Sequence, residues 1–281
     1  MSTESLYPDY LHVRPDGFTP TLYIPAFDTV EPGLRADPSL FDVLTSKTGI
    51  KNITPRVGTA IRNLQLSQLT PAGLDQVALL AAQRGVLVFR DQDFADIGPE
   101  RQLEIARHFG PLHRHPTMGY FKGTGPEFQL VYTDEKVGNL RHLLGSRTNY
   151  DLWRVDQTFT PNTPGTTFFW VLEIPASGGG DTAFTSLTAA YKALSPTFRE
   201  DLHRLKLLHT SASVGEVARV SQERALKEAV KTEHPLVISH PVTKEPVLFR
   251  TVAHSPVPDF TDGERRHMVR MISYGSQPQP L

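Results

Sequence analysis

Short β-rich runs recur along this chain from residue 86 onward and limit the folds open to it. Glycine, proline or a long loop bounds each run, and helical segments lie between them. Runs of this length, with helices interspersed and no internal repeat, are typical of a mixed α/β domain that is mainly β. The most distinct runs are residues 86–91, 128–134 and 165–175.

The helical segments carry recognisable end signals. In "LTPAGLDQVALLAAQRG", Thr70 suits the N-cap, Pro71 the first helical position and Gly85 the C-terminal stop. We also predict helices in "GPERQLEIARHFG", which ends at Gly110, and in residues 188–205 and 214–230.

Proline, glycine, aspartate and isolated aromatics fill the first part of the chain without a sustained period. We therefore predict that residues 1–60 form an irregular N-terminal arm. The remainder, residues 61–281, is expected to form one domain, because a chain of 281 residues can bury a sizeable core.

Charge and hydropathy restrict the partners. Lysine and arginine total 29 against 30 acidic residues, so no strong global field attracts nucleic acid or an anionic membrane. The expected partner is a small molecule, and a homo-oligomer stays open. The start of the chain lacks an apolar signal region, and no apolar run is long enough to cross a bilayer. We therefore expect a cytoplasmic protein.

The chain contains no cysteine, which excludes disulfides, thiolate metal sites and a cysteine nucleophile. Any metal must be held by nitrogen and oxygen ligands. An oxygen-activating iron site of this kind takes two imidazoles and one carboxylate. In sequence it often consists of His-x-Asp on one strand and a distant histidine.

The stretch "YDLWRVDQTF" sets Arg154 and Asp156 two residues apart in what is typical of a buried strand, where they would share one face. One interpretation is an ion pair at a strand edge. The other makes Asp156 the carboxylate of a metal site. His254 and His240 are both candidates for the distant imidazole, and spacing alone does not choose between them.

Two further stretches are candidates for anion binding. In "GERRHMVRM", Arg266 and Arg270 would share one strand face, and two guanidinium forks there suit a carboxylate or sulfonate group. The alternative is a solvated basic edge that blocks strand pairing. "SGGGDT", which ends at Thr182, lacks the lysine and spacing of a P-loop and favours a turn between strands. No G-x-S-x-G elbow supports a serine hydrolase.

Taken together, several stretches in this order resemble the taurine/2,4-D dioxygenase (TauD/TfdA) family of non-haem Fe(II) and 2-oxoglutarate enzymes. The resemblance covers about residue 69 to the end and is to the fungal sulfonate-dioxygenase-like branch. It implies a double-stranded β-helix, a jelly-roll-like pair of sheets with flanking helices. The stretches are "GVLVFRDQDF", "ARHFGPLHRHP", "LWRVDQTFTPNTPG", "LEIPASGGGDTAFTSLTAAYKALSP", "HPLVISHPVTKEPVLF" and "AHSPVPDFTDGERRHMVRM".

The resemblance also assigns roles to individual residues. It makes Asp156 and His254 iron ligands, and it places His240 in a turn that holds no ligand. Thr182 and Arg266 match the residues that hold 2-oxoglutarate. The positions that face the prime substrate are His115, Arg270 and Tyr150. The implied reaction uses Fe(II), 2-oxoglutarate and O2 to hydroxylate a small, anionic substrate such as a sulfonate or carboxylate, or a secondary metabolite.

Two departures from the family pattern bear on this interpretation. Arg154 occupies the position of the first iron histidine, and a guanidinium has no lone pair to give a metal. The strand ending at Phe249 runs directly into Arg250, where the family has a further helical segment and strand, so the β-helix is expected to be incomplete in its C-terminal half. The second hypothesis is therefore a catalytically inactive family member that binds a small anion without turnover. At the substrate side, Met118 and Tyr150 replace residues of the taurine enzymes, which argues against taurine itself.

Overall fold

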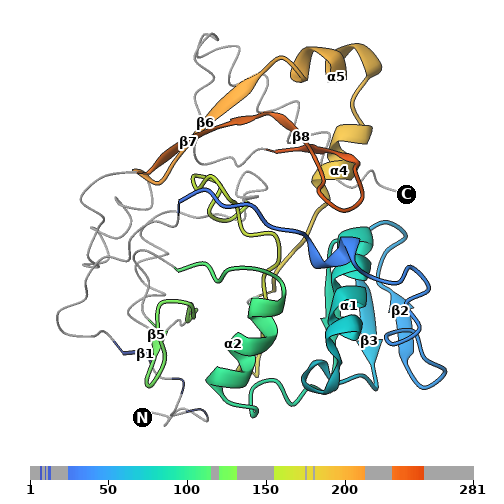
Figure 1. The fold of residues 1–281 in the computed structure, drawn as a ribbon, viewed down its shortest axis with the longest axis vertical. Helices are drawn as coiled ribbons and strands as arrows, with labels where there is room; N and C mark the ends of the chain where they lie inside the picture. Colours follow the sequence, from blue (N-terminus) through green and yellow to red (C-terminus); the bar gives the residue numbers. More distant parts are fainter. Residues whose placement is uncertain are drawn as a thin grey trace.

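The structure is a computed structural model, and it describes residues 7, 10, 12–13, 25–114, 120–131, 155–174, 176–179, 181–212 and 230–249. Two groups of elements make up most of this part of the chain, as Figure 1 shows. The first group is built around α1 and a small sheet, and the second around the β6–β7 ribbon. A minor pair, β1 (His12–Val13) and β5 (Tyr120–Phe121), is antiparallel.

The first group contains a three-stranded sheet. β2 (Gly49–Asn52) pairs antiparallel with β3 (Thr59–Arg62), and β3 pairs parallel with β4 (Leu87–Phe89). The connection from β3 to β4 passes through a short 3-10 turn, η3 (Leu66–Gln68), and helix α1 (Pro71–Arg84). A second helix, α2 (Pro99–His108), follows β4.

Helix α1 has the ends that its sequence predicts. The Thr70 side chain accepts a hydrogen bond from the backbone N–H of Gly73 at 3.1 Å, and Pro71 occupies the first turn. At the other end, Gly85 has a φ of 72°, a left-handed conformation that glycine adopts without steric cost. Arg84 then donates to the Thr59 hydroxyl at 2.8 Å and anchors α1 to β3.

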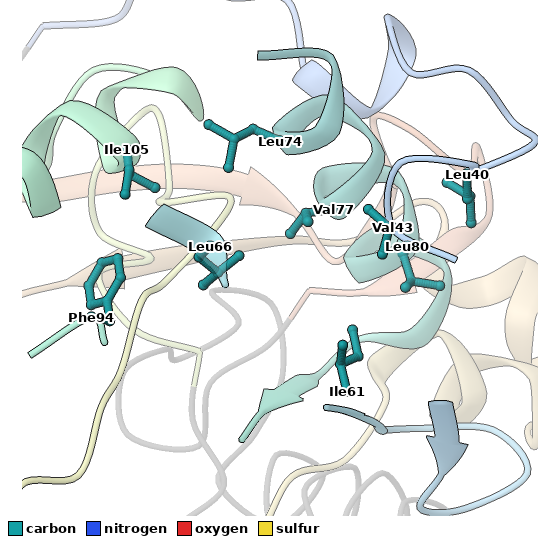
Figure 2. Packing of buried hydrophobic residues seen from close by; sticks show 9 residues of the cluster. All are labelled: Leu40, Val43, Ile61, Leu66, Leu74, Val77, Leu80, Phe94 and Ile105. Atoms are coloured by element: carbon teal, nitrogen blue, oxygen red, sulfur yellow. The ribbon is translucent and has the colours of Figure 1, made fainter. Parts of the chain in front are cut away.

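The core of the first group lies between α1, α2 and the sheet (Figure 2). The side chains of Phe168 and Trp170, from a segment far along the chain, pack against it. Asp75 on α1 adds polar links, because its carboxylate accepts from Arg35 at 2.7 Å and lies 2.8 Å from Nε2 of His108 on α2. The buried core residues are Leu40, Val43, Ile61, Leu66, Leu74, Val77, Leu80, Phe94 and Ile105.

The second group has a smaller core. Helices α4 (Leu187–Lys192) and α5 (Pro196–Leu202) are capped by the hydroxyls of Ser186 and Ser195. β6 (Lys206–Thr210) pairs antiparallel with β7 (Lys231–Pro235), and β8 (Val237–Ser239) pairs antiparallel with β9 (Pro246–Leu248). Their buried apolar side chains are those of Tyr191, Leu202, Leu207, Leu236 and Leu248.

The two groups meet at a short 3-10 turn, η2 (Pro32–Leu34). A Cβ placed on the buried Gly33 would lie 3.1 Å from Cγ1 of Val242, between β8 and β9, and 3.2 Å from the backbone of Leu79 on α1. The chain of η2 therefore passes between helix α1 and the β8–β9 hairpin. Residues 155–174 also connect the groups, running between them in Figure 1.

Several sequence-based expectations need correction. The predicted helix at residues 188–205 is two helices, because Pro196 begins a new one after the Ser195 cap. Residues 128–131 and 165–174 are not strands, although 165–174 alternates in burial from Phe168 to Leu172. A strand needs a neighbour to take its backbone hydrogen bonds, and none of the described residues pairs with them in a ladder. The helix predicted at 214–230 lies almost entirely outside the described residues.

The described residues form sheets of two and three strands and no closed barrel. The double-stranded β-helix, expected to be incomplete in its C-terminal half, therefore remains a prediction. In the part of the chain that the structure covers, no helix combines the length and apolar character needed to cross a membrane.

Candidate functional site

The structure describes two of the predicted site residues, Asp156 and Thr182. Both are exposed to solvent. The other predicted residues lie outside the described part of the chain, so their geometry stays a prediction. They are Tyr150, Arg154, His115, His254, Arg266 and Arg270.

Asp156 lies at the start of a turn, where a strand was predicted. Residues 156–159 form the turn, and Gln157 has a φ of 57°. This left-handed conformation diverts the backbone from the extended path that a strand requires. The backbone N–H of Thr160 donates to the carbonyl of Gln157 at 3.1 Å, and the Thr160 hydroxyl lies 2.8 Å from the same carbonyl oxygen.

Burial begins two residues after Asp156 and fixes the turn, whereas Asp156 itself is exposed. Thr158 is 2% exposed and Phe159 5% exposed. On the side of the N-terminal arm, the amide of Asn162 pairs with the backbone of Phe27, donating to its carbonyl at 2.8 Å and accepting from its N–H at 3.1 Å. The segment that carries Asp156 is therefore fixed to the N-terminal arm by these two hydrogen bonds.

Strand β7 holds the other side of the turn. The Thr232 hydroxyl donates to the carbonyl of Phe159 at 2.6 Å, and Nε2 of His234 lies 3.2 Å from the carbonyl oxygen of Thr160. A carbonyl only accepts, so Nε2 of His234 carries the proton in this contact. Both side chains point inward, since the alternate residues Lys231, Glu233 and Pro235 of this strand are exposed.

Two further rings pack around His234. His209 on β6 is completely buried, with its ring 5.2 Å from that of His234 and 5.4 Å from that of Phe249. The rings of His234 and Phe249 are 5.2 Å apart and nearly perpendicular. Edge-to-face contacts of this kind are favourable between aromatic rings and keep each ring in one orientation.

These β7 and β6 residues were missed at the level of sequence. The signal that could have found them is the alternation in "KTEHP", which places Thr232 and His234 on one face of a strand and two charged residues and a proline on the other. Inward-facing polar side chains need partners, so such a pattern predicts hydrogen bonds to a neighbouring segment.

Thr182 lies in the loop before α4. Gly178 and Gly179 have φ values of 79° and 101°, so this loop turns at the glycines as predicted, but residues 181–186 do not form the expected strand. The exposed hydroxyl of Thr182 is accessible to a ligand.

His240, the alternative for the distant imidazole, serves a turn. Its Nδ1 accepts from the backbone N–H groups of Val242 at 3.1 Å and Thr243 at 3.2 Å. Burial lowers the pKa of this imidazole, and Glu245 partly opposes the shift. The lone pair at Nδ1 is therefore already used within the protein.

A hollow of about 320 Å³ is lined by residues that flank His113 in the sequence and by Glu127. Arg107 and Arg114 contribute cations to its wall, and Nε of Arg114 donates to Glu127 at 2.9 Å. Burial lowers the pKa of His113. The remaining wall residues are Pro111 and Leu112.

A metal site needs several donor side chains close together. No group of three or more His, Cys, Asp or Glu residues with suitable geometry occurs among the residues that the structure describes. By the family resemblance, Asp156, which is exposed, would supply one oxygen donor and His254 one nitrogen donor. An iron site of the facial type takes a third protein ligand, and arginine cannot serve as one. The residues therefore fit an iron ion only in part.

Comparisons with known proteins agree on one family. The model of the family described as "Taurine catabolism dioxygenase TauD, TfdA family" matches residues 49–272. The chain is 40% identical, over 271 residues, to the alpha-ketoglutarate-dependent dioxygenase cnsM of Penicillium expansum, covering 95% of this chain and 75% of that protein. It is 35% identical, over 259 residues, to an alpha-ketoglutarate-dependent sulfonate dioxygenase of Saccharomyces cerevisiae. That match covers 90% of this chain and 61% of the yeast protein.

A solved structure shares the fold. A putative alpha-ketoglutarate-dependent taurine dioxygenase from Burkholderia xenovorans superposes with a TM-score of 0.63 at 22% identity, covering 82% of this chain and 75% of that one. At this identity the likeness is evidence for the fold alone.

Proposed function

The chain belongs to the TauD/TfdA family of dioxygenases, and from that membership we propose that it hydroxylates a small anionic substrate, a sulfonate or carboxylate or an anionic secondary metabolite. The observation that carries the proposal is the family match across residues 49–272. The named sulfonate dioxygenase among its relatives favours a substrate with a negatively charged group. The chain is shorter than these relatives, so its own turnover is part of the proposal.

In this family, bound Fe(II) and 2-oxoglutarate supply the oxidising chemistry. Asp156 would contribute a carboxylate oxygen to the metal and His254 an imidazole nitrogen. Asp156 is exposed, so a metal ion from solution can reach its carboxylate. Thr158 and Phe159 of the same turn are buried, so the backbone that carries the carboxylate is held in place. Both features support this role.

The co-substrate and substrate would be held by cations and hydroxyls. Arg266 and Thr182 would bind a carboxylate of 2-oxoglutarate, and Thr182 is exposed to solvent. His115, Tyr150 and Arg270 would face the prime substrate, with Arg270 pairing with its anionic group.

One specific observation favours a second candidate function. By the family resemblance, Arg154 takes the sequence position of the first iron histidine, so a cation would stand there in place of a ligand. In that case the chain binds a small anion without turnover, and the ion pair of Arg154 with Asp156 replaces the metal.

Anaerobic titration of the full chain with Fe(II) and 2-oxoglutarate tests these proposals. We expect the visible charge-transfer band of the chelate, with loss of the band in Asp156→Asn. A band that is absent from the parent chain and present in Arg154→His would support the anion-binding candidate. No band in either protein would contradict the assignment of Asp156 to a metal.

A further inference from the structure

Two side chains of β7 form hydrogen bonds to the backbone shortly after Asp156. Thr232 and His234 are two residues apart on one strand, and each makes a hydrogen bond to a carbonyl of the turn, that of Phe159 or that of Thr160. More than seventy positions separate the partners in sequence. The contact is therefore a tertiary link between the β6–β7 ribbon and the turn.

The link involves groups that water does not reach easily. Phe159 and Thr160 are 5% and 8% exposed. A buried carbonyl that loses its donor keeps its desolvation penalty, so both hydrogen bonds favour one position of the turn. Because the Thr160 hydroxyl and N–H also bond to the carbonyl of Gln157, the position of Thr160 is passed on to the residue adjacent to Asp156.

The donors are themselves held in place. His209 and Phe249 pack against the ring of His234, and His209 pairs with Thr232 in the β6–β7 register. A donor whose own orientation is restrained by packing gives a more defined position to its acceptor than a mobile surface side chain does. The β6–β7 ribbon is thus a support for the turn.

From this geometry we propose that Thr232 and His234 are positioning residues for the carboxylate of Asp156. They act through the backbone of Phe159, Thr160 and Gln157 and set the direction in which the carboxylate leaves the turn. The inference rests on the proposed function, since it takes Asp156 as a metal ligand. Nothing in the family resemblance assigned a role to either residue.

The test uses Co(II) as a spectroscopic probe in the full chain, with and without Arg154→His. Thr232→Val removes the hydroxyl at nearly constant volume, and Thr232→Ser retains it. Thr210→Val on the paired strand β6 is the matched control, because its hydroxyl contacts Ala212 and not the turn. Four quantities are measured: the Co(II) affinity, the visible spectrum of bound Co(II), hydrogen exchange of the amides at residues 157–160 and 162, and the urea unfolding midpoint.

We expect Thr232→Val to weaken Co(II) binding about tenfold, in the range known for residues that orient a ligand, and to alter the Co(II) spectrum. Amide exchange in the turn should rise. Thr232→Ser should restore Co(II) binding and amide exchange to the values of the parent. Thr210→Val should leave Co(II) binding and amide exchange close to the parent, even where its unfolding midpoint falls as much as that of Thr232→Val. His234→Gln, which keeps an N–H near the same place, should resemble Thr232→Ser.

Two results would overturn the inference in different ways. We call the two hydrogen bonds from Thr232 and His234 to the turn the clamp. If the Arg154→His protein binds Co(II) and adding Thr232→Val changes neither the affinity nor the spectrum, the clamp does not position the ligand although the metal site is real. If Co(II) binds to neither parent, the metal site fails and the positioning role with it, while a rise in turn exchange in Thr232→Val would leave only a structural clamp. Unchanged exchange in Thr232→Val contradicts the clamp whatever the metal does.

Discussion

His240 illustrates how one half-buried side chain decides the local structure of a turn. Its Nδ1 accepts two backbone N–H groups, so the neutral imidazole is the form that the folded chain requires. Burial lowers the pKa of His240 below the ordinary value of 6.5, with Glu245 opposing and Lys244 reinforcing the shift. As the pH falls below 6.5, the unfolded chain takes up this proton before the folded chain does.

The expected consequence is a loss of stability at acid pH. The free energy of unfolding should fall between pH 7.5 and pH 5.5, and the fall should be smaller in His240→Asn, whose side-chain oxygen can accept the same N–H groups without titrating. Urea unfolding at the two pH values measures this. His113, whose pKa is also lowered by burial, should account for part of the dependence that remains. An equal fall in both proteins would show that His240 does not titrate in this way.

At this scale the sequence predicts local signals well and tertiary ones poorly. Thr70 and Gly85 could be assigned because a cap depends on neighbours within four residues. The turn after Asp156 could not be predicted, because glutamine, unlike glycine, is not typical of the left-handed conformation that Gln157 adopts. The roles of Thr232 and His234 depend on a segment more than seventy positions away, which no local pattern encodes.

Among the elements, the segment at residues 165–174 shows best that an alternating burial pattern does not by itself make a paired strand. Its alternation gives it two unlike faces. Phe168 stacks on Phe94 at 5.9 Å and meets Phe109 edge-on at 5.0 Å, whereas Phe169 is 61% exposed. The pattern identified which side chains face the core. It could not identify a pairing partner, because hydrogen bonding between strands depends on which other segments lie alongside.

The two faces should respond differently to truncation. Phe168→Ala should lower the free energy of unfolding by about 2–3 kcal/mol, since the ring packs against the first core but is only partly buried. Phe169→Ala should change it by less than about 0.5 kcal/mol and, by removing an exposed ring, should reduce binding of an apolar dye. Urea unfolding and dye fluorescence of the two variants provide the comparison, each serving as the other's control. Equal losses of stability would mean that the exposed face is covered in solution.

For the molecule as a whole, the two hydrophobic cores and the contact between them matter most. The helical part of the first core followed from apolar spacing and caps, which is why α1 and α2 were found from sequence. The second core joins α4, α5, β6 and β9, and neither the strands of the β6–β7 ribbon nor the way the later strands pair was predicted from the sequence. Which surfaces of the two cores touch depends on packing that arises only after both have formed.

Gly33 marks that contact. It is buried between α1 and the β8–β9 hairpin, and an added Cβ would lie 3.2 Å from the backbone of Leu79 and 3.1 Å from Cγ1 of Val242. Val242 can shift, but the backbone of a helix interior yields less, so Gly33→Ala should push η2 away from α1 and separate the two groups. We expect a loss of about 1–3 kcal/mol in the free energy of unfolding, the usual cost of overpacking.

Gly165→Ala is the matched control, because its added Cβ would come no closer than 3.6 Å to Oε1 of Glu31, an ordinary contact at an exposed position. It should change stability by less than about 0.5 kcal/mol. Hydrogen exchange should then show faster opening in Gly33→Ala both at α1 and at β8–β9, since the substitution acts on the surface that the two groups share. Faster exchange in α1 alone would mean that the hairpin does not depend on this contact, and an unchanged midpoint would mean that η2 can move without cost.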